Sequence, residues 1–170
     1  MFSIYNNGKP SPRGYSQTRE NGLKISNFAL FSSAADAIEL CLFRDGKESR
    51  FALSRTDDIW HVAIEGVELN DEYAFRITGK NDRTLANPQK LMLDPYAKAV
   101  VGKPDLSSAE VRSIFQLNDP RDNAEFAPKG QIIETAFDWQ HDKAPKTPWA
   151  ETVIYELSVK GFSQLRADPV

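Results

Sequence analysis

Apolar and polar residues alternate along the first half of the chain in the way that is typical of β-strands. Every second residue is apolar in three segments, namely Ile38/Leu40/Leu42, Trp60/Val62/Ile64 and Tyr73/Phe75/Ile77. Because successive side chains of a strand point to opposite faces, this period of two predicts strands with one buried face. Five short strands are expected, at residues 23–31, 38–43, 50–53, 59–64 and 73–78.

Residues that favour turns separate these segments, and Asp45-Gly46 is the strongest hairpin signal among them. An Asp-Gly pair suits the two positive-φ positions of a tight two-residue hairpin. Short strands joined by such turns predict an all-β fold, an antiparallel sandwich of roughly 100 residues. Residues 1–21 are polar and rich in glycine and proline, so they are expected to form an irregular arm.

The pattern changes in the second half of the chain. Pro88 and Pro95 exclude one continuous helix or central strand between residues 87 and 101. The long proline-rich segment that follows shows one helical signal, at residues 107–115, and is interpreted as a covering segment or a linker. The apolar residues 152–162 predict a final strand, and pairing of that strand back onto the sandwich is the alternative interpretation.

The charge and the cysteine content narrow the class of protein. The net charge is -3 and no basic cluster stands out, which argues against nucleic acid as the partner. The first residues lack the features of a signal peptide, and no apolar run approaches the roughly 20 residues that cross a bilayer, so no membrane association is expected. The single cysteine, Cys41, excludes an internal disulfide and fits a reducing compartment. A cytoplasmic protein is therefore expected.

Few residues could catalyse a reaction or hold a metal ion. Two histidines and one cysteine are too few for a zinc cluster, and no phosphate-binding loop or serine-nucleophile motif is present. His61 lies on the strand face opposite Trp60 and is expected to face solvent, whereas Cys41 lies in an apolar run and is expected in the core. The sequence therefore predicts no catalytic residue, no metal site and no cofactor.

The three tryptophans are the remaining candidates for ligand binding, because indole rings can stack on sugars. Trp60 alternates with apolar residues and is predicted to lie in the core. Trp139 and Trp149 lie among prolines and are candidate carbohydrate-binding residues. The alternative is that each ring pins its loop to a protein surface.

Eight phrases occur in one order along the chain. They are residues 22–32 (GLKISNFALFS), 38–43 (IELCLF), 58–61 (DIWH), 73–77 (YAFRI), 87–98 (NPQKLMLDPYAK), 137–139 (FDW), 148–156 (PWAETVIYE) and 160–162 (KGF). In this order the chain resembles the N-terminal region of bacterial glycogen debranching enzymes of the isoamylase type, in the α-amylase superfamily. The resemblance extends over nearly the whole chain.

This resemblance implies a division of the chain into three parts. Residues 1–100 would form an immunoglobulin-like β-sandwich of the starch-binding type, and residues 101–150 a proline-rich linker or covering segment. Residues 151–170 would begin a (β/α)8 catalytic barrel, with its first strand at Val153 to Val159. The barrel needs roughly 250 residues. The missing barrel of the same polypeptide is thus an expected partner.

The resemblance also implies an activity for the longer protein. Such enzymes hydrolyse α-1,6 branch linkages of glycogen or limit dextrin with retention of configuration, using two aspartates and a glutamate on later barrel strands. No catalytic residue is therefore expected within residues 1–170, which should be inactive alone. An α-glucan is the expected ligand. The sandwich would position the substrate and support the barrel.

Two positions depart from the pattern of the family. Ser158 stands where relatives usually have histidine, and Leu91 stands where glycogen-binding relatives have an aromatic residue three positions before the Asp94-Pro95 pair. The departure at Leu91 argues against independent glycan binding by the sandwich and favours a role in supporting the barrel and shaping the substrate cleft. A stand-alone, non-catalytic α-glucan-binding module is the alternative function. An interaction module without a sugar ligand is a third, and a branching or trehalose-releasing relative would share the same sandwich.

Overall fold

A computed structural model of the chain describes residues 1–79, 86–134 and 138–164. Phe137 of the 137–139 phrase and residues 165–170 of the expected barrel segment lie outside the described residues. The chain divides into two units, Met1–Thr135 and Ala136–Val170. Among the described residues no helix is long and apolar enough to span a membrane.

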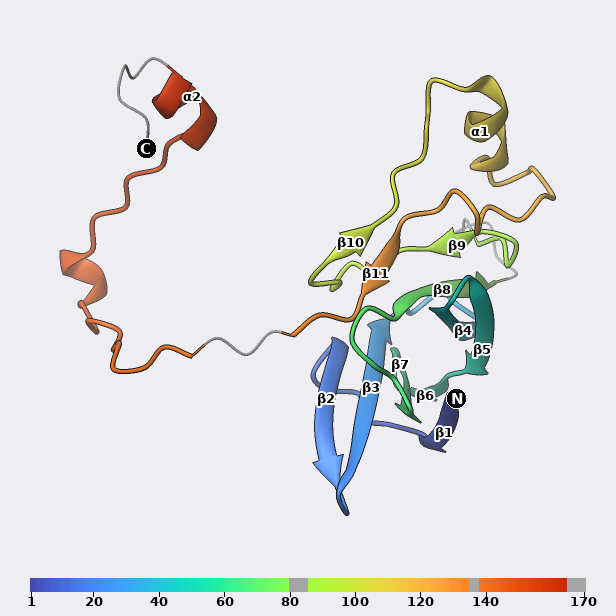
Figure 1. Ribbon diagram of the computed structural model, residues 1–170, viewed down its shortest axis with the longest axis horizontal. Helices are drawn as coiled ribbons and strands as arrows, with labels where there is room; N and C mark the ends of the chain where they lie inside the picture. Colours follow the sequence, from blue (N-terminus) through green and yellow to red (C-terminus); the bar gives the residue numbers. More distant parts are fainter. Residues whose placement is uncertain (80–85, 135–137, 165–170) are drawn as a thin grey trace. The chain divides into compact units, whose positions relative to one another are not determined.

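The first unit contains two antiparallel sheets, and the first of these has five strands (Figure 1). Its central strand β7 (Ile59–Glu65) pairs with β3 (Leu23–Phe31) along one edge. Two short strands, β1 (Ser3–Asn6) and β6 (Ser54–Thr56), share the other edge of β7. The outer strand β2 (Gly14–Glu20) pairs with β3 through residues 14–29, which completes the order β1-β7-β3-β2.

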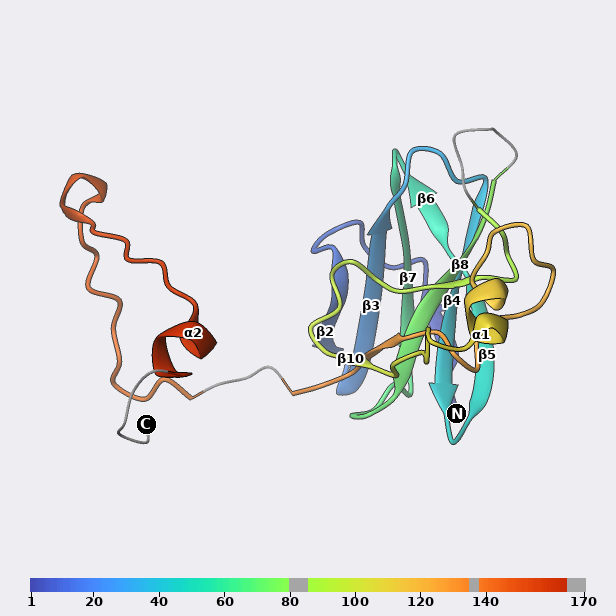
Figure 2. The same ribbon diagram turned by 90° about the horizontal axis from the view of Figure 1, so that it is seen from above.

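The second sheet has six strands and lies against the first, as Figure 2 shows. Its strands are β4 (Ala37–Arg44), β5 (Lys47–Ala52), β8 (Glu72–Thr78), β9 (Leu91–Met92), β10 (Val100–Val101) and β11 (Lys129–Gln131). β8 pairs with β4 on one edge and with β9 and β11 on the other. The order is β10-β11-β8-β4-β5. The predicted all-β antiparallel sandwich is therefore confirmed.

The β4–β5 hairpin shows how one local signal sets the register of two strands. Asp45 and Gly46 both have positive φ, at 52° and 72°. A two-residue turn with two such residues matches the right-handed twist of the flanking strands. Arg44 accordingly pairs with Lys47, and the ladder continues to Glu39 and Ala52. The predicted Asp-Gly hairpin is confirmed.

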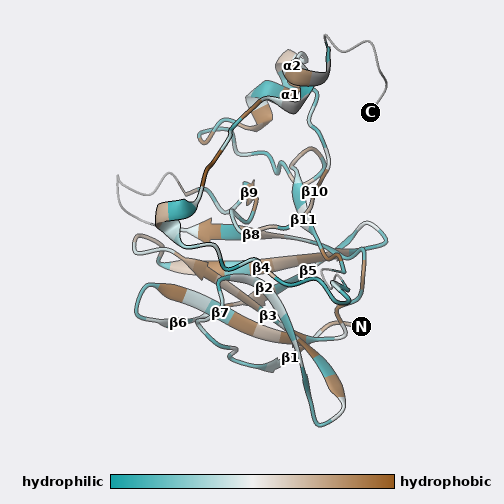
Figure 3. Ribbon diagram, turned by 90° about the vertical axis from the view of Figure 1, so that its left-hand side faces the viewer, coloured by the Kyte–Doolittle hydropathy of each residue, from teal (hydrophilic) through white to brown (hydrophobic). Residues whose placement is uncertain are grey.

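The core lies between the two sheets and contains the residues of the predicted alternation. Its fully buried members include Phe28, Ile38, Leu40, Leu42, Val62, Ile64, Tyr73 and Phe75. Hydrophobic and hydrophilic colours accordingly change along the strands of both sheets in Figure 3. Phe28 lies at the centre, with its ring centroid 5.1 Å from that of Tyr73 in an edge-to-face arrangement. Burial of one such aromatic side chain stabilises the fold by about 1.5–3 kcal/mol.

The expectation of an irregular arm at residues 1–21 is wrong. This segment supplies β1 and β2, whose burial is too mixed to produce an apolar alternation. Both are edge strands, so their hydrogen bonds to β7 and β3 define them rather than an apolar face.

His61 is also not solvent-facing as expected, because it is only 5 % exposed. Its side chain does lie on the β7 face opposite the core, but the residues between β1 and β2 cover that face. The Nδ1–H donates to the carbonyl oxygen of Asn7 at 2.7 Å, and Nε2 accepts from the hydroxyl of Thr56 at 2.9 Å. Both ring nitrogens are therefore used within the fold.

The first unit does not end at residue 100, where the sequence placed the end of the sandwich. β10, a short helix and β11 extend it to Thr135. The helix α1 (Ala109–Ile114) begins after Ser108, whose hydroxyl accepts from the backbone N–H of Val111. This N-cap lies within the predicted 107–115 helix. Residues 102–128 therefore cover the second sheet as part of the domain, and a linker can begin only after them.

The second unit contains a 3-10 turn, η1 (Trp149–Glu151), and the helix α2 (Val159–Gln164). The strand expected at Val153 to Val159 is absent: residues 152–158 have no regular structure, and Val159 begins α2. A strand requires hydrogen bonds to a neighbouring strand. No other described segment pairs with residues 152–158, so these residues form no strand although several of them are apolar and β-branched.

Candidate functional site

Trp139 and Trp149, the predicted carbohydrate-binding residues, both lie in the second unit. Their side chains are 65 % and 81 % exposed. Trp149 opens the η1 turn, and the carbonyl oxygen of Trp139 accepts from the backbone N–H of Asp142 at 2.8 Å. Exposed indole rings offer the apolar face that a sugar ring can stack on. Their role in sugar binding stays a prediction.

Trp60 belongs to the core, as the sequence predicts, and is not a binding platform. It is 6 % exposed, and its indole N–H donates to the carbonyl oxygen of Ser32 at 3.0 Å. The guanidinium of Arg55 lies 5.4 Å from the ring centroid. The indole is thus buried among contacts that stabilise the sandwich.

The surface around Leu91 is covered by the chain itself. Leu91 is 4 % exposed and packs in a small apolar cluster with Cys41, Phe43, Ala74 and Ala127. Partly buried Phe115 and Ala124 close this cluster from outside. The Leu91 side chain is therefore inside the domain and not available to a ligand at the surface.

Asn123 holds the covering segment against β9. Its amide oxygen accepts from the backbone N–H of Leu91 at 2.6 Å, and its amide nitrogen donates to the Leu91 carbonyl at 3.4 Å. Asn123 is 2 % exposed. A buried amide with both groups satisfied replaces a strand partner for β9. Nothing in the local sequence pattern identifies this residue, because its partner is more than thirty positions away in the chain.

A buried arginine ties the same segment to the second sheet. Arg76 is 1 % exposed; it donates to Glu48 at 2.9 Å, to Asp122 at 2.8 Å and to the carbonyl oxygen of Pro88 at 3.1 Å. Burial alone would raise the pKa of Glu48, but hydrogen bonds from Arg76 and Arg50 outweigh it and lower the pKa to about 2. The network thus consists of charged groups paired with one another, and its role is structural.

Asp94 and Tyr73 form a second buried polar pair, beneath the turn that follows β9. The Tyr73 hydroxyl donates to Asp94 Oδ2 at 2.9 Å, and Asp94 Oδ1 accepts from the backbone N–H of Tyr96 at 2.9 Å. Burial raises the pKa values of both groups. The conspicuous Asp94-Pro95 pair of the sequence therefore anchors this turn to the core.

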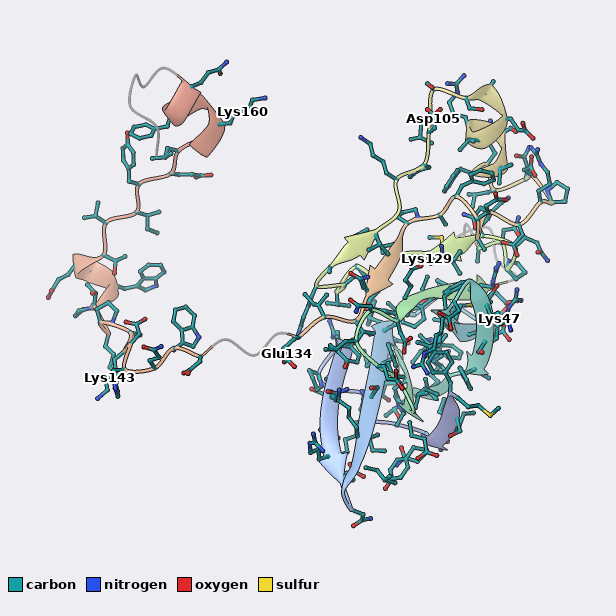
Figure 4. The ribbon with its side chains drawn as sticks, viewed as in Figure 1. Lys47, Asp105, Lys129, Glu134, Lys143 and Lys160 are labelled. Carbon is teal, nitrogen blue, oxygen red and sulfur yellow. The ribbon has the colours of Figure 1, made fainter. Side chains whose placement is uncertain are left out.

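A hollow of about 780 Å³ opens at one end of the second sheet. The β4–β5 hairpin, the β7–β8 loop and residues 124–129 line it. Its two cations form ion pairs with acidic residues that also line the hollow. Arg44 donates two hydrogen bonds to Asp71, of 2.8 and 2.6 Å. Lys129, labelled in Figure 4, lies 3.8 Å from Glu72. The Lys129 ammonium also lies 5.0 Å from the Phe43 ring centroid. Both cations of the hollow therefore take part in contacts within the first unit.

Metal and thiol chemistry find no support in the described part of the chain. Its His, Cys, Asp and Glu side chains form no group that could hold a metal ion. Cys41 is fully buried, as the sequence predicts, and burial raises the pKa of its thiol. The thiol therefore stays protonated in the core.

The family model of carbohydrate-binding module 48 (isoamylase N-terminal domain) matches residues 12–97. Among curated proteins, the chain is 60 % identical over 166 residues to the "Glycogen operon protein GlgX homolog" of Haemophilus influenzae. It is 43 % identical over 164 residues to a "Glycogen debranching enzyme" of Klebsiella pneumoniae. These matches cover 97 % and 93 % of this chain but 25 % and 24 % of the two proteins. The chain thus spans about a quarter of the length of these relatives.

Among solved structures, the catalytic module of SpuA, a multi-modular glycogen-degrading pneumococcal virulence factor, matches with a TM-score of 0.51 and 19 % identity. The match covers 75 % of this chain and 17 % of that one. The group B Streptococcus pullulanase SAP matches with a TM-score of 0.50 and 15 % identity, over 74 % of this chain and 15 % of that one. At these identities the similarity concerns the fold.

Proposed function

The chain belongs to the carbohydrate-binding module 48 (isoamylase N-terminal domain) family, and from this premise we propose that it is the non-catalytic, α-glucan-binding N-terminal region of a glycogen debranching hydrolase. The observation that carries the proposal is the 60 % identity to the GlgX homolog over 97 % of this chain. That relative and the glycogen debranching enzymes are about four times as long as this chain. The longer polypeptide would supply the catalytic residues.

The proposed reaction is retaining hydrolysis of α-1,6 branch linkages in glycogen or limit dextrin. The two carboxyl groups that such a double displacement needs would lie in the barrel, roughly 5–5.5 Å apart. The sandwich would support that barrel and bring the glucan to it. Residues 151–170 would belong to the start of the barrel, where residues 153–159 would find the partner strands that they lack here. The unpaired Cys41 thiol is consistent with a cytoplasmic location, which we propose as well.

Trp139 and Trp149 are the proposed sugar-stacking residues of the second unit. Their exposure supports this role, because an aromatic residue that stacks on a ligand must be accessible. In the longer protein, alanine at either position should weaken binding to glycogen. Affinity electrophoresis in glycogen-containing gels measures this effect. Leu23→Ala, which removes an exposed apolar side chain of the first unit, is the control.

The activity is tested by assaying two proteins in parallel on glycogen limit dextrin. One is the longer polypeptide that begins with these residues, and the other is the chain 1–170. We expect reducing ends and short linear glucans to be released by the longer protein only. Lack of debranching by the longer protein would contradict the proposal. Debranching by residues 1–170 alone would contradict the assignment of catalysis to the barrel.

A further inference from the structure

Three exposed side chains from distant parts of the sequence meet on the surface of the first unit. They are Arg13, which precedes β2, Phe31 at the end of β3, and Tyr96 in the turn after Asp94-Pro95. The Arg13 guanidinium lies 5.5 Å from the centroid of the Phe31 ring. Its Nη1 donates to the Tyr96 hydroxyl at 3.4 Å. Phe31 is 48 % exposed and Tyr96 is 39 % exposed.

The buried pair of Asp94 and Tyr73 holds the backbone of Tyr96 in position. Asp94 is 1 % exposed and accepts from the Tyr96 backbone N–H with one carboxyl oxygen and from the Tyr73 hydroxyl with the other. The backbone N–H of Ala97 also donates to the carbonyl oxygen of Asp94 at 3.1 Å. Tyr96 therefore projects from a turn that the core holds in place.

Gly14 allows the start of β2 to approach this turn. It has φ of +79°, and a Cβ built on it would lie 2.6 Å from the Cβ of Tyr96. Any other residue would have to push Tyr96 away and adopt a strained backbone. Arg13 directly precedes Gly14, so this close approach brings its backbone near the turn that carries Tyr96.

Phe31 extends from β3 on the face opposite the core. Its strand neighbour Leu30 points inward and is 6 % exposed, so the pleat of β3 directs Phe31 outward. The cation–π contact with Arg13 stabilises this arrangement. It leaves about half of the Phe31 side chain accessible, with guanidinium N–H donors beside it.

Two aromatic rings that contact an exposed arginine have the chemistry that a neutral sugar chain requires. A pyranose ring presents C–H groups that stack on an aromatic face, and hydroxyl oxygens that accept hydrogen bonds from a guanidinium. We infer that Arg13, Phe31 and Tyr96 form a binding surface for a linear α-1,4-glucan segment on the first unit. This inference rests on the proposed glucan-binding function and assigns it a place. None of its three residues belongs to the covered Leu91 cluster.

The inference is tested with maltoheptaose as the probe and the chain 1–170 as the protein. The double variant Phe31→Ala/Tyr96→Ala should raise the Kd at least about tenfold, equivalent to about 1.4 kcal/mol. Tyr96→Phe should retain most of the affinity, because it keeps the ring. Leu23→Ala is the matched control, since Leu23 is 47 % exposed at the far end of the same β2–β3 pair. Circular dichroism of each variant reports whether the sandwich is intact.

A second measurement needs no substitution. In a titration of the unmodified chain with maltoheptaose, the ring proton signals of Phe31 and Tyr96 should shift, and those of Phe28 in the core should not. Binding that is unchanged in the double variant, with these ring signals unmoved, would overturn the surface and leave the proposed function standing. Absence of any glucan binding, by this chain and by the longer protein alike, would overturn both.

Discussion

Each of the two units contains an apolar segment, but only the segment in the first unit forms a buried strand. In the first unit, β7 carries the run Ile59–Glu65, and five of its seven residues are buried. In the second unit, Val153, Ile154 and Tyr155 are 91 %, 74 % and 81 % exposed. β7 has paired strands on both edges, whereas residues 152–158 have none among the described residues. The difference teaches that an apolar, β-branched sequence becomes a strand only where a partner strand is available.

The largest expected effect is a loss of stability in the first unit caused by a substitution in its core. Phe28→Ala removes a fully buried ring at the centre of the core, which should lower the free energy of unfolding by about 3–5 kcal/mol. Tyr155→Ala should change it by less than about 0.5 kcal/mol, because an exposed ring contributes little. Urea unfolding of residues 1–170, followed by circular dichroism, measures both. Equal losses for the two variants would contradict the division into a packed and an unpacked unit.

A smaller effect concerns the segment that covers the second sheet. Asn123→Ala removes both hydrogen bonds to the backbone of Leu91 and leaves buried groups unpaired, which should cost about 1–3 kcal/mol. It should also expose Leu91, detectable as faster hydrogen exchange in residues 115–127. Glu125→Ala, at an exposed position of the same segment, is the control, with little expected change. If Asn123→Ala were neutral, the covering segment would be held by its apolar contacts alone.

The pH dependence of stability tests whether the ion pairs of Glu48 stabilise the fold. The folded-state pKa of Glu48 is lowered from its ordinary value of 4.5 to about 2, because its hydrogen bonds from Arg76 and Arg50 outweigh its burial. A lowered folded-state pKa stabilises the fold fully above about pH 4.5, and this contribution is lost as the pH falls towards 2. Urea midpoints measured across this range should decline for the natural chain. Glu48→Gln should have a lower midpoint at neutral pH and a flatter decline; an unchanged slope would contradict the assignment.

The fold could be predicted wherever the signal is local. Asp45-Gly46 fixes its hairpin through the backbone conformation of two residues, and Ser108 begins α1 by capping its first turn. Sequence alternation likewise identifies β4, β7 and β8, because each has one face on the core. These features need no knowledge of the rest of the molecule.

The features that the sequence did not reveal depend on distant partners. His61 is buried because Asn7 and the rest of its segment cover it, and β1 is a strand only through its pairing with β7. Lys90, 2 % exposed, is buried because its ammonium donates to the carbonyl oxygens of Ile114 and Arg121. The two sets of glucan-binding candidates differ in the same way. Trp139 and Trp149 could be named from composition, whereas the meeting of Arg13 with Tyr96 is visible only in three dimensions.

The central claim is that residues 1–170 are the N-terminal region of a longer debranching enzyme, and the size of the native gene product tests it most directly. An antibody against this chain, used on a lysate of the source cells, should detect a band about four times the 19.1 kDa of the chain, because the chain spans 25 % of its GlgX homolog. A band at 19.1 kDa would contradict the claim. It would leave a stand-alone α-glucan-binding module as the function.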